Sequence, residues 1–364
     1  MKLTDGNFHF IQTTKMSQER QKLGYGASLP DFVVESYKSE ETYSRCLELI
    51  NEADALIVGS APEEMIRERL KAGKLVIRYS ERLFKNKKEW LKLPYRIVKF
   101  HRRDLGDKNV YLLCSSAYSA WDYSCLGMYK GKTFKWGYFP PTKRYENVEE
   151  LMENKKPASI LWVARLLGLK HPDASILCAE RLVKEGYKDF RLNVIGIGPL
   201  ESELKALIKE KGLENYVSLL GAMKPEEVRK HMEESKIFLF TSDFNEGWGA
   251  VLNEAMNSGC AVVASHAIGS VPFLLKDKDN GLIYKNGDID SLYSDVKWLL
   301  DNPKKADEMG KKAYETLANV WNAETAASRL VNIIQGLLDG RDVSKLYADG
   351  PCSKAQIIKN NWFK

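Results

Sequence analysis

Residues 241–264 read TSDFNEGWGAVLNEAMNSGCAVVA, and this stretch decides the fold class. The apolar run 237–240 before it predicts a buried parallel strand, a polar turn follows, and a helix then begins. Gly247 and Gly249 allow the backbone to approach a bound group closely. Because the first N–H groups of a helix are unpaired and lie at its positive end, the stretch predicts an anion site between a strand and a helix.

Two glutamates flank this turn. Glu246 precedes the helix, and we expect Glu254 two turns inside it. A spacing of eight residues returns to nearly the same face of a helix, so both carboxylates are expected to address one ligand along its length. The alternative is an ordinary strand-loop-helix unit that binds nothing.

The stretch resembles the E-x7-E motif of retaining glycosyltransferases of family 4. The match extends over GWGAVLNEAMNSGCAVVAS at 247–265, Gly269, Pro272 and NGLIY at 280–284, in that family's order and spacing. The resemblance implies an α/β protein of GT-B architecture, in which two Rossmann-like domains face a central cleft. It also implies transfer of a hexosyl group from a nucleotide-diphosphate sugar, with retention of the anomeric configuration, to a hydroxyl of a glycan or lipid-linked acceptor in cell-surface polysaccharide synthesis.

Two cations border the turn after the apolar segment 159–165. Arg165 ends this segment and Lys170 follows five residues later. Ligands of open α/β sheets bind at the carboxyl ends of the strands, where a guanidinium and an ammonium can clamp a diphosphate. From the residues alone, two solvated loop cations are the alternative. The resemblance favours the clamp, since the family's diphosphate-binding arginine and lysine have this spacing.

The resemblance also assigns roles to the site residues. Glu246 would hold the sugar hydroxyls, and Glu254 would accept hydrogen bonds from the ribose. Arg165 and Lys170 would stabilise the leaving diphosphate. The other donor-binding residues are Trp248, Gly249, Ala250, Val251, Gly198 and Met223. No metal or other cofactor is implied. The general base is not identified. Glu81 is one candidate; the alternative is that Glu81 is only an ion-paired surface residue.

Other functions fit the same residues. A noncatalytic nucleotide-sugar-binding protein would share the phosphate cradle, and so would another GT-B enzyme, an epimerase or a phosphorylase. The D-x-D strings at 277–279 and 288–290 could hold a metal for the diphosphate, but the second precedes an amphipathic segment and is better explained by helix capping. We interpret His266 as a satisfied turn residue rather than a catalytic base.

The length of 364 residues is enough for two domains with a core in each. No apolar run approaches the ~20 residues needed to cross a bilayer, and the first residues lack the apolar core of a signal peptide, so we expect a cytoplasmic protein. The six cysteines are widely spaced. Cys114, Cys178 and Cys260 fall in apolar segments, which predicts buried thiols rather than disulfides or zinc ligands.

Alternating strand and helix patterns predict an N-terminal Rossmann-like acceptor domain over 1–140, a linker over 141–157 and a C-terminal donor domain over 158–320. Residues 321–364 are expected to cross back to the first domain. The N-terminal strands are expected at 8–12, 31–36, 53–60, 74–80 and 109–116. Because the chain opens at what resembles the second strand of the family, the first strand-loop-helix is expected to be missing or altered.

Basic charge is concentrated in the first half of the chain. The net charge is +6, and residues 1–140 carry 24 basic and 17 acidic side chains (+7), which leaves −1 for the remainder. No recognised nucleic-acid module is present, so we expect no nucleic-acid partner.

Residues 81–103 carry nine of these basic side chains against two acidic ones. The spacing of Leu83, Phe84, Trp90 and Leu91 predicts one amphipathic helix. A basic helix with aromatic residues on its apolar face is typical of peripheral contact with an anionic membrane, here the inner face of the cell membrane. A charged helix packed on its own domain is the alternative.

Overall fold

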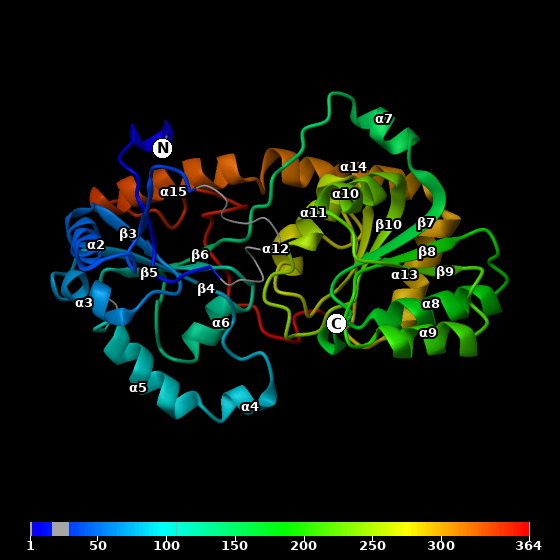
Figure 1. Ribbon diagram of the computed structural model, residues 1–364, viewed down its shortest axis with the longest axis horizontal. Coiled ribbons are helices and arrows are strands. Elements are labelled where there is room, and N and C mark those ends of the chain that lie inside the picture. Colours follow the sequence, from blue (N-terminus) through cyan, green and yellow to red (C-terminus); the bar gives the residue numbers. More distant parts are fainter. Residues whose placement is uncertain (1, 17–28, 107, 364) are drawn as a thin grey trace.

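The computed structural model describes residues 2–16, 29–106 and 108–363. They form two lobes that lie side by side, each with one main parallel sheet (Figure 1). The helices α14 (Pro303–Asn319) and α15 (Ala323–Leu338) run one after the other along both lobes.

Six strands form the sheet of the C-terminal lobe: β7 (Lys156–Val163), β8 (Arg191–Ile195), β9 (Val217–Gly221), β10 (Ser235–Phe240), β11 (Ala261–Ser265) and β12 (Leu282–Tyr284). Their order is β12-β11-β10-β7-β8-β9, and all neighbours are parallel. Counted from β7, this is the doubly wound order 3-2-1-4-5-6, which reverses direction between β7 and β10. A ligand crevice is expected outside the carboxyl ends of these two strands.

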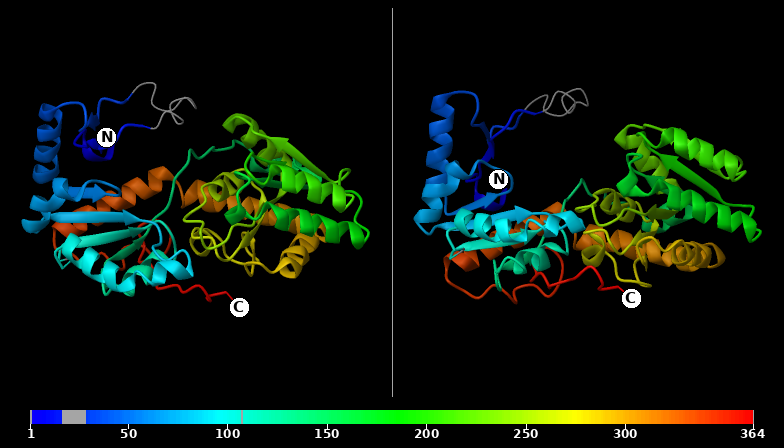
Figure 2. Two further views of the ribbon diagram at one scale, coloured as in Figure 1. Left: turned by 60° about the horizontal axis from the view of Figure 1, so that its bottom comes forward. Right: turned by 90° about the horizontal axis from the view of Figure 1, so that it is seen from below.

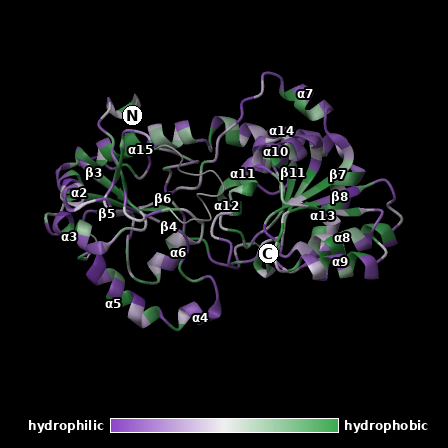
Figure 3. Ribbon diagram, in the orientation of Figure 1, coloured by the Kyte–Doolittle hydropathy of each residue, from purple (hydrophilic) through white to green (hydrophobic). Residues whose placement is uncertain are grey.

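The helices of this lobe are α7 (Val148–Glu153), η2 (Gly168–Lys170), α8 (Pro172–Lys184), α9 (Glu201–Glu210), α10 (Pro225–Glu234), α11 (Val251–Asn257), α12 (Val271–Leu274), α13 (Ile289–Asp301) and α14. Side chains of a strand alternate between faces. Ile237 and Leu239 of β10 therefore join one core, and Phe238 and Phe240 join the other. The strands of this sheet are mainly hydrophobic (Figure 3), which is typical of a parallel sheet covered on both faces.

Four strands form the sheet of the N-terminal lobe, in the order β3 (Ala55–Val58), β4 (Leu75–Ser80), β5 (Val110–Cys114) and β6 (Thr133–Lys135), all parallel. Its helices are α2 (Glu40–Glu52), α3 (Glu63–Lys71), α4 (Lys87–Trp90), α5 (Leu93–Arg103) and α6 (Ser119–Ser124). Leu330 and Ile333 of α15 pack against Leu75 and Ile77, so this helix covers one face of the sheet. The cysteines Cys114, Cys178 and Cys260 are buried free thiols, as predicted.

The start of the chain departs from the doubly wound pattern. After η1 (Lys2–Thr4), β1 (Phe10–Gln12) and β2 (Val33–Glu35) pair in parallel with each other and, within the described ranges, with no other strand. Figure 2 shows this segment, in blue, projecting from the N-terminal lobe. The main sheet begins only at β3, so the front of this domain is altered, as the sequence predicted.

The prediction of a single helix over 81–103 is wrong. The chain forms α4, which begins at a side-chain cap from Asn86, and a separate helix α5 with Pro94 in its first turn. Phe84 is 1% exposed and stacks on Trp90 with ring centroids 4.1 Å apart, in the core of the N-terminal lobe. Most of the predicted apolar face therefore packs on its own domain. Among the described helices, none combines the length and the apolarity needed to cross a membrane.

Candidate active site

The loops after β7 and β10 meet where the strand order reverses. Thr241 Oγ1 donates to the carbonyl oxygen of Lys170 at 2.6 Å, and the Asp243 N–H donates to the Leu169 carbonyl at 3.0 Å. The buried indole of Trp162 donates to Thr241 Oγ1 at 2.8 Å. These bonds hold the two loops together at the edge of the sheet where the topology predicts a ligand crevice.

Lys170 and Glu246 form an ion pair between these two loops. Lys170 Nζ contacts Glu246 Oε2, and Ser242 Oγ donates to the same oxygen at 3.0 Å. The two charged side chains are 18% and 12% exposed. The structure thus brings together two residues that the sequence assigned to one site. Their direct pairing, in which each compensates the charge of the other, was not predicted.

Arg165 lies in the turn after β7 and is exposed, and its guanidinium has no hydrogen-bond partner in the described part of the chain. The turn is fixed by its backbone, because the Leu166 N–H donates to the Ile197 carbonyl at 3.0 Å. A side chain at Gly198 would overlap the backbone of Leu166, so this close approach requires glycine. The structure therefore places Gly198 against the Arg165 turn, and anion binding by the guanidinium stays a prediction.

The turn between β10 and α11 also depends on a glycine. Gly249 has φ +80°, and a side chain there would overlap the ring of Phe240 and lie 3.3 Å from Glu246 Cγ. Ala250 and Val251 follow, half-buried, at the start of α11. Because the irregular turn extends to residue 250, the helix begins later than the sequence suggested.

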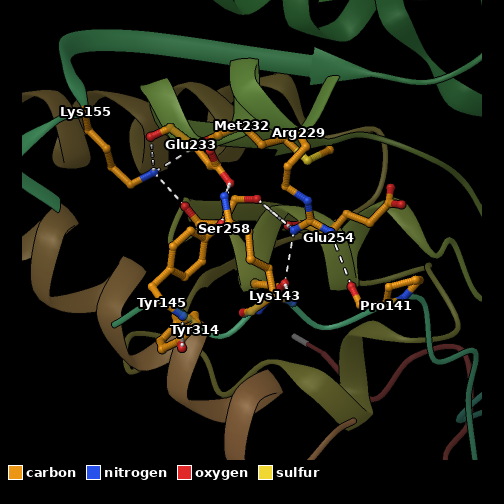
Figure 4. A network of polar contacts seen from close by, with 11 residues as sticks. Pro141, Lys143, Tyr145, Lys155, Arg229, Met232, Glu233, Glu254, Ser258 and Tyr314 are labelled. Carbon is orange, nitrogen blue, oxygen red and sulfur yellow. Dashed lines mark hydrogen bonds and ion pairs between the residues drawn. The ribbon is translucent and has the colours of Figure 1, made fainter. Parts of the chain in front are cut away.

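Glu254 consequently lies in the first turn of α11, and the prediction that it lies two turns inside the helix is wrong. Its carboxyl is partly buried, and this burial raises its pKa while Arg229 opposes the rise. Arg229 Nη1 donates to Asn257 Oδ1 and Ser258 Oγ, both at 3.1 Å, and Nη2 donates to the Pro141 carbonyl at 3.5 Å (Figure 4).

Arg229 thus ties α11 to the segment that connects the two lobes. Figure 4 shows it between the α11 residues and Pro141. Arg229 could not be predicted from the sequence, because it lies 25 residues from Glu254 on another helix and no local pattern links the two.

Trp248 packs at the junction of the lobes. It is 1% exposed, its Nε1 donates to Asn253 Oδ1 at 2.9 Å, and its ring lies 6.4 Å from that of Tyr138 and 6.0 Å from that of Trp321. A side chain at Gly137 would overlap the indole. The Trp248 side chain therefore has a packing role, and donor contact through its backbone N–H stays a prediction.

Met223 lies in the turn after β9, behind Gly221 with φ +73°. Its side chain is half-buried and packs against the core that contains Phe240 and Leu252. Contact between this loop and a nucleotide base stays a prediction.

Two interpretations from the sequence are confirmed: the D-x-D string at 288–290 caps a helix, and His266 is a satisfied turn residue. Asp288 Oδ1 accepts a hydrogen bond from the Ser291 N–H at 2.9 Å and caps α13. His266 Nδ1 accepts from the Asn286 N–H at 2.9 Å and Nε2 lies 3.1 Å from the Asn360 carbonyl, so both ring nitrogens are satisfied. The described residues contain no group of three His, Cys, Asp or Glu side chains placed to hold a metal ion.

Glu81 reaches the site from the opposite lobe. It follows β4, accepts a hydrogen bond from the Tyr138 hydroxyl at 2.6 Å, and forms an ion pair with Lys85 at 3.0 Å. A side chain at Gly247 would overlap the Glu81 carboxylate, and one at Gly269 would overlap the Gly247 carbonyl. Glu81 is ion-paired, which agrees with the alternative to a general base. It also borders the turn that carries Glu246.

Residues 143–316 match the family described as glycosyl transferases group 1. The amylovoran biosynthesis glycosyltransferase AmsK of Erwinia amylovora is 30% identical over 187 residues, which are 50% of this chain and 46% of that protein. The poly(ribitol-phosphate) alpha-N-acetylglucosaminyltransferase of Staphylococcus aureus is 28% identical over 171 residues, 47% of this chain and 34% of that protein. The match thus spans less than half the length of either relative.

The crystal structure of HepE from Anabaena, in complex with UDP, resembles the fold with a TM-score of 0.65. The two chains are 15% identical, and the match covers 91% of each. The similarity confirms the expected two-lobed architecture. Residues 143–316 thus resemble the glycosyl transferases group 1 family, and the whole chain has the two-lobed GT-B fold.

Proposed function

We propose that this chain transfers a hexosyl group from a nucleotide-diphosphate sugar to a hydroxyl of a glycan or lipid-linked acceptor, with retention of configuration and without a metal. The observation that supports this proposal most is the Lys170–Glu246 ion pair between the loops after β7 and β10, which are bonded to each other. The names of the relatives support a role in polysaccharide synthesis, since AmsK is described for amylovoran biosynthesis.

In the proposed reaction, the bond between the anomeric carbon and the diphosphate oxygen breaks. The acceptor oxygen bonds to the same face of that carbon, and the acceptor gives up its proton. Negative charge grows on the diphosphate, where Arg165, Lys170 and the N–H groups of residues 248–251 would stabilise it. Loss of one such donor typically costs about 10²–10³ in rate. These two cations would supply the charge that a divalent metal supplies in other transferases.

The Lys170–Glu246 ion pair suggests how donor binding rearranges the site. A diphosphate carries more negative charge than one carboxylate, so it would compete with Glu246 for Lys170. Glu246 would then be free to accept hydrogen bonds from the sugar hydroxyls. Glu254, whose pKa is raised by burial, would accept hydrogen bonds from the ribose in a partly dry pocket.

Glu81 is our candidate for the residue that orients the acceptor hydroxyl. Its carboxylate is held by Tyr138 and Lys85 and lies against Gly247, one residue from Glu246. A fixed carboxylate from the opposite lobe can accept the hydroxyl hydrogen and aim the oxygen at the donor sugar.

The surface of α5 is our candidate for contact with an anionic membrane. Although Phe84 and Trp90 are packed inward, Leu91, Tyr95 and Val98 are 83%, 65% and 51% exposed. The basic side chains around them are Lys87, Lys88, Lys92, Lys99 and Arg102. Exposed apolar side chains among lysines suit a surface of anionic lipid headgroups, which would bring a lipid-linked acceptor to the enzyme.

A panel of nucleoside diphosphates and sugar nucleotides tests this function. The matching nucleotide at 100 times Kd should stabilise the protein by about 2.7 kcal/mol in a thermal-shift assay. Arg165→Ala and Glu254→Ala should each remove this shift, whereas Lys209→Ala, an exposed cation on α9, should retain it. Binding without consumption of any donor would show a noncatalytic binder, and consumption without an acceptor would show an epimerase.

A further inference from the structure

The segment after α15 joins the two lobes a second time. The Cys352 N–H donates to the Lys135 carbonyl at 2.8 Å and the Ala355 N–H donates to the Thr133 carbonyl at 3.0 Å, so the segment lies along β6. It then leaves the N-terminal lobe and reaches the junction at residues 360–363 (Figure 1, red). This segment has no role in the proposed reaction.

Two residues of the segment each bind both lobes. Asn360 Oδ1 accepts from Arg82 Nη2 of the N-terminal lobe, and its carbonyl oxygen accepts from His266 Nε2 of the C-terminal lobe, both at 3.1 Å. Trp362 Nε1 lies 2.9 Å from the Tyr118 hydroxyl and 3.3 Å from the His266 carbonyl. Asn360 and Trp362 therefore each link the two lobes.

The donor role of His266 follows from its other nitrogen. Nδ1 accepts from the Asn286 N–H, so in the neutral ring the proton must be on Nε2, which donates to the Asn360 carbonyl. The C-terminal lobe thus presents a defined donor to the segment.

Aromatic contacts extend this joint to the donor loop. Phe363 stacks on His266 with centroids 6.0 Å apart, and Phe244 lies 5.4 Å from His266 and 5.9 Å from Tyr118. Phe244 is two residues from Glu246 in the same turn. The segment therefore packs against the turn that carries the proposed sugar-binding carboxylate.

The joint is incompletely satisfied. Arg82 and Asp122 are buried and form an ion pair, with Arg82 Nη2 3.6 Å from Asp122 Oδ1. Arg82 Nε and Nη1 and Asp122 Oδ1 nevertheless have no hydrogen-bond partner among the described residues. Such groups are costly while buried and regain hydrogen bonds from water when uncovered. Asn360, Trp362 and Phe363 are themselves only partly buried. Both features lower the cost of lifting the segment.

We infer that residues 360–363 form a displaceable clasp that fastens the two lobes in the arrangement in which Glu81 borders Gly247. The lobes also contact each other directly, for example through the Ala117 N–H and the Gly269 carbonyl at 2.8 Å. Release of the clasp removes the added links and lets the lobes separate more readily, and its closure fixes Phe244 and the adjoining donor turn. That substrates exchange during the open phase rests on the proposed function, whereas the opening itself does not.

Trp362→Ala tests the clasp without any substrate. Radius of gyration from small-angle X-ray scattering should increase, and tryptic cleavage after the exposed Lys359 should become at least tenfold faster by mass spectrometry. Ile357→Ala is the matched control, since this residue of the same segment is 62% exposed, and it should behave like the wild type. Asn360→Ala removes fewer atoms than Trp362→Ala and should have the same effect.

An unchanged radius of gyration and unchanged cleavage in both Trp362→Ala and Asn360→Ala would overturn the clasp. If a donor sugar is identified, Trp362→Ala should also raise the ratio of donor hydrolysis to transfer, because an open junction admits water. Failure of every nucleotide to bind the wild type would refute the proposed function and leave the scattering result standing.

Discussion

The C-terminal lobe positions its candidate site residues from one sheet, whereas the N-terminal lobe positions Glu81 through contact with its neighbour. Lys170 and Glu246 follow adjacent strands, and their loops are bonded to each other. Glu81 follows β4, and its place in the site depends on the glycine-lined contact with Gly247. A site built within one lobe should survive changes at the junction, and a residue that acts across the junction should not.

Lys170→Ala should have the largest effect. It removes a proposed diphosphate ligand, so turnover should fall by about 10²–10³. Stability should change much less, because Glu246 keeps its bond from Ser242 and gains access to water once the lysine side chain is removed. Turnover with a saturating acceptor and the thermal midpoint, measured on the same preparations, separate the two effects. Lys209→Ala is the control, and equal turnover in both variants would remove Lys170 from the site.

Glu81→Gln should have a smaller and different effect. Misplacement of a reacting group by about 1 Å can cost up to about 10² in rate, so we expect a loss of that order or less. The loss should appear in turnover and in KM for the acceptor, while the Kd for the nucleoside diphosphate stays unchanged. A changed nucleotide affinity would show that Glu81 acts on the donor side and would break the contrast between the lobes.

The sequence predicted the strand-loop-helix units of the C-terminal lobe well because their signals are local. The apolar run before Thr241, the glycines of the next turn and the spacing of Arg165 and Lys170 all lie within short segments that fold by their own backbone preferences. Contacts between distant segments could not be predicted from the sequence. The Lys170–Glu246 pair, Arg229 on α10 and the approach of Glu81 to Gly247 all depend on how distant elements pack.

The failed helix over 81–103 has a different cause. Its apolar spacing was counted across two signals that each mark the start of a helix. Asn86 caps α4, and Pro94 stands in the first turn of α5, where proline is favoured because its missing N–H would be unpaired in any case. These signals were present in the sequence, so the break at this point could have been predicted. The burial of Phe84 could not.

Asp295 tests whether the stability of the C-terminal lobe can change while the activity of the candidate site stays the same. Burial, with a smaller contribution from Asp277, raises the pKa of Asp295 to about 7. The unfolded chain releases this proton near pH 4, so between pH 4 and pH 7 the folded state binds more protons and loses stability as the pH rises. Asp295→Asn removes this loss.

We therefore expect Asp295→Asn to be more stable than the wild type at pH 8 by about 1–2 kcal/mol, a value reduced for the partial exposure of the carboxyl. The difference should shrink toward pH 4. Urea denaturation at both pH values measures it, with the exposed Asp189→Asn as control. A difference that does not depend on pH would contradict the assignment. Turnover should be unaffected.

The smallest effect concerns the uneven charge of the two lobes. Lys99 is exposed on α5 beside Tyr95, whereas Lys209 is an equally exposed lysine in the other lobe. One lysine near an anionic leaflet contributes about 1 kcal/mol, so Lys99→Gln should weaken binding to phosphatidylglycerol vesicles about fivefold at low salt, and Lys209→Gln should not. Flotation measures both. Equal losses would mean that vesicles respond to net charge alone, and α5 would then have no privileged orientation toward the membrane.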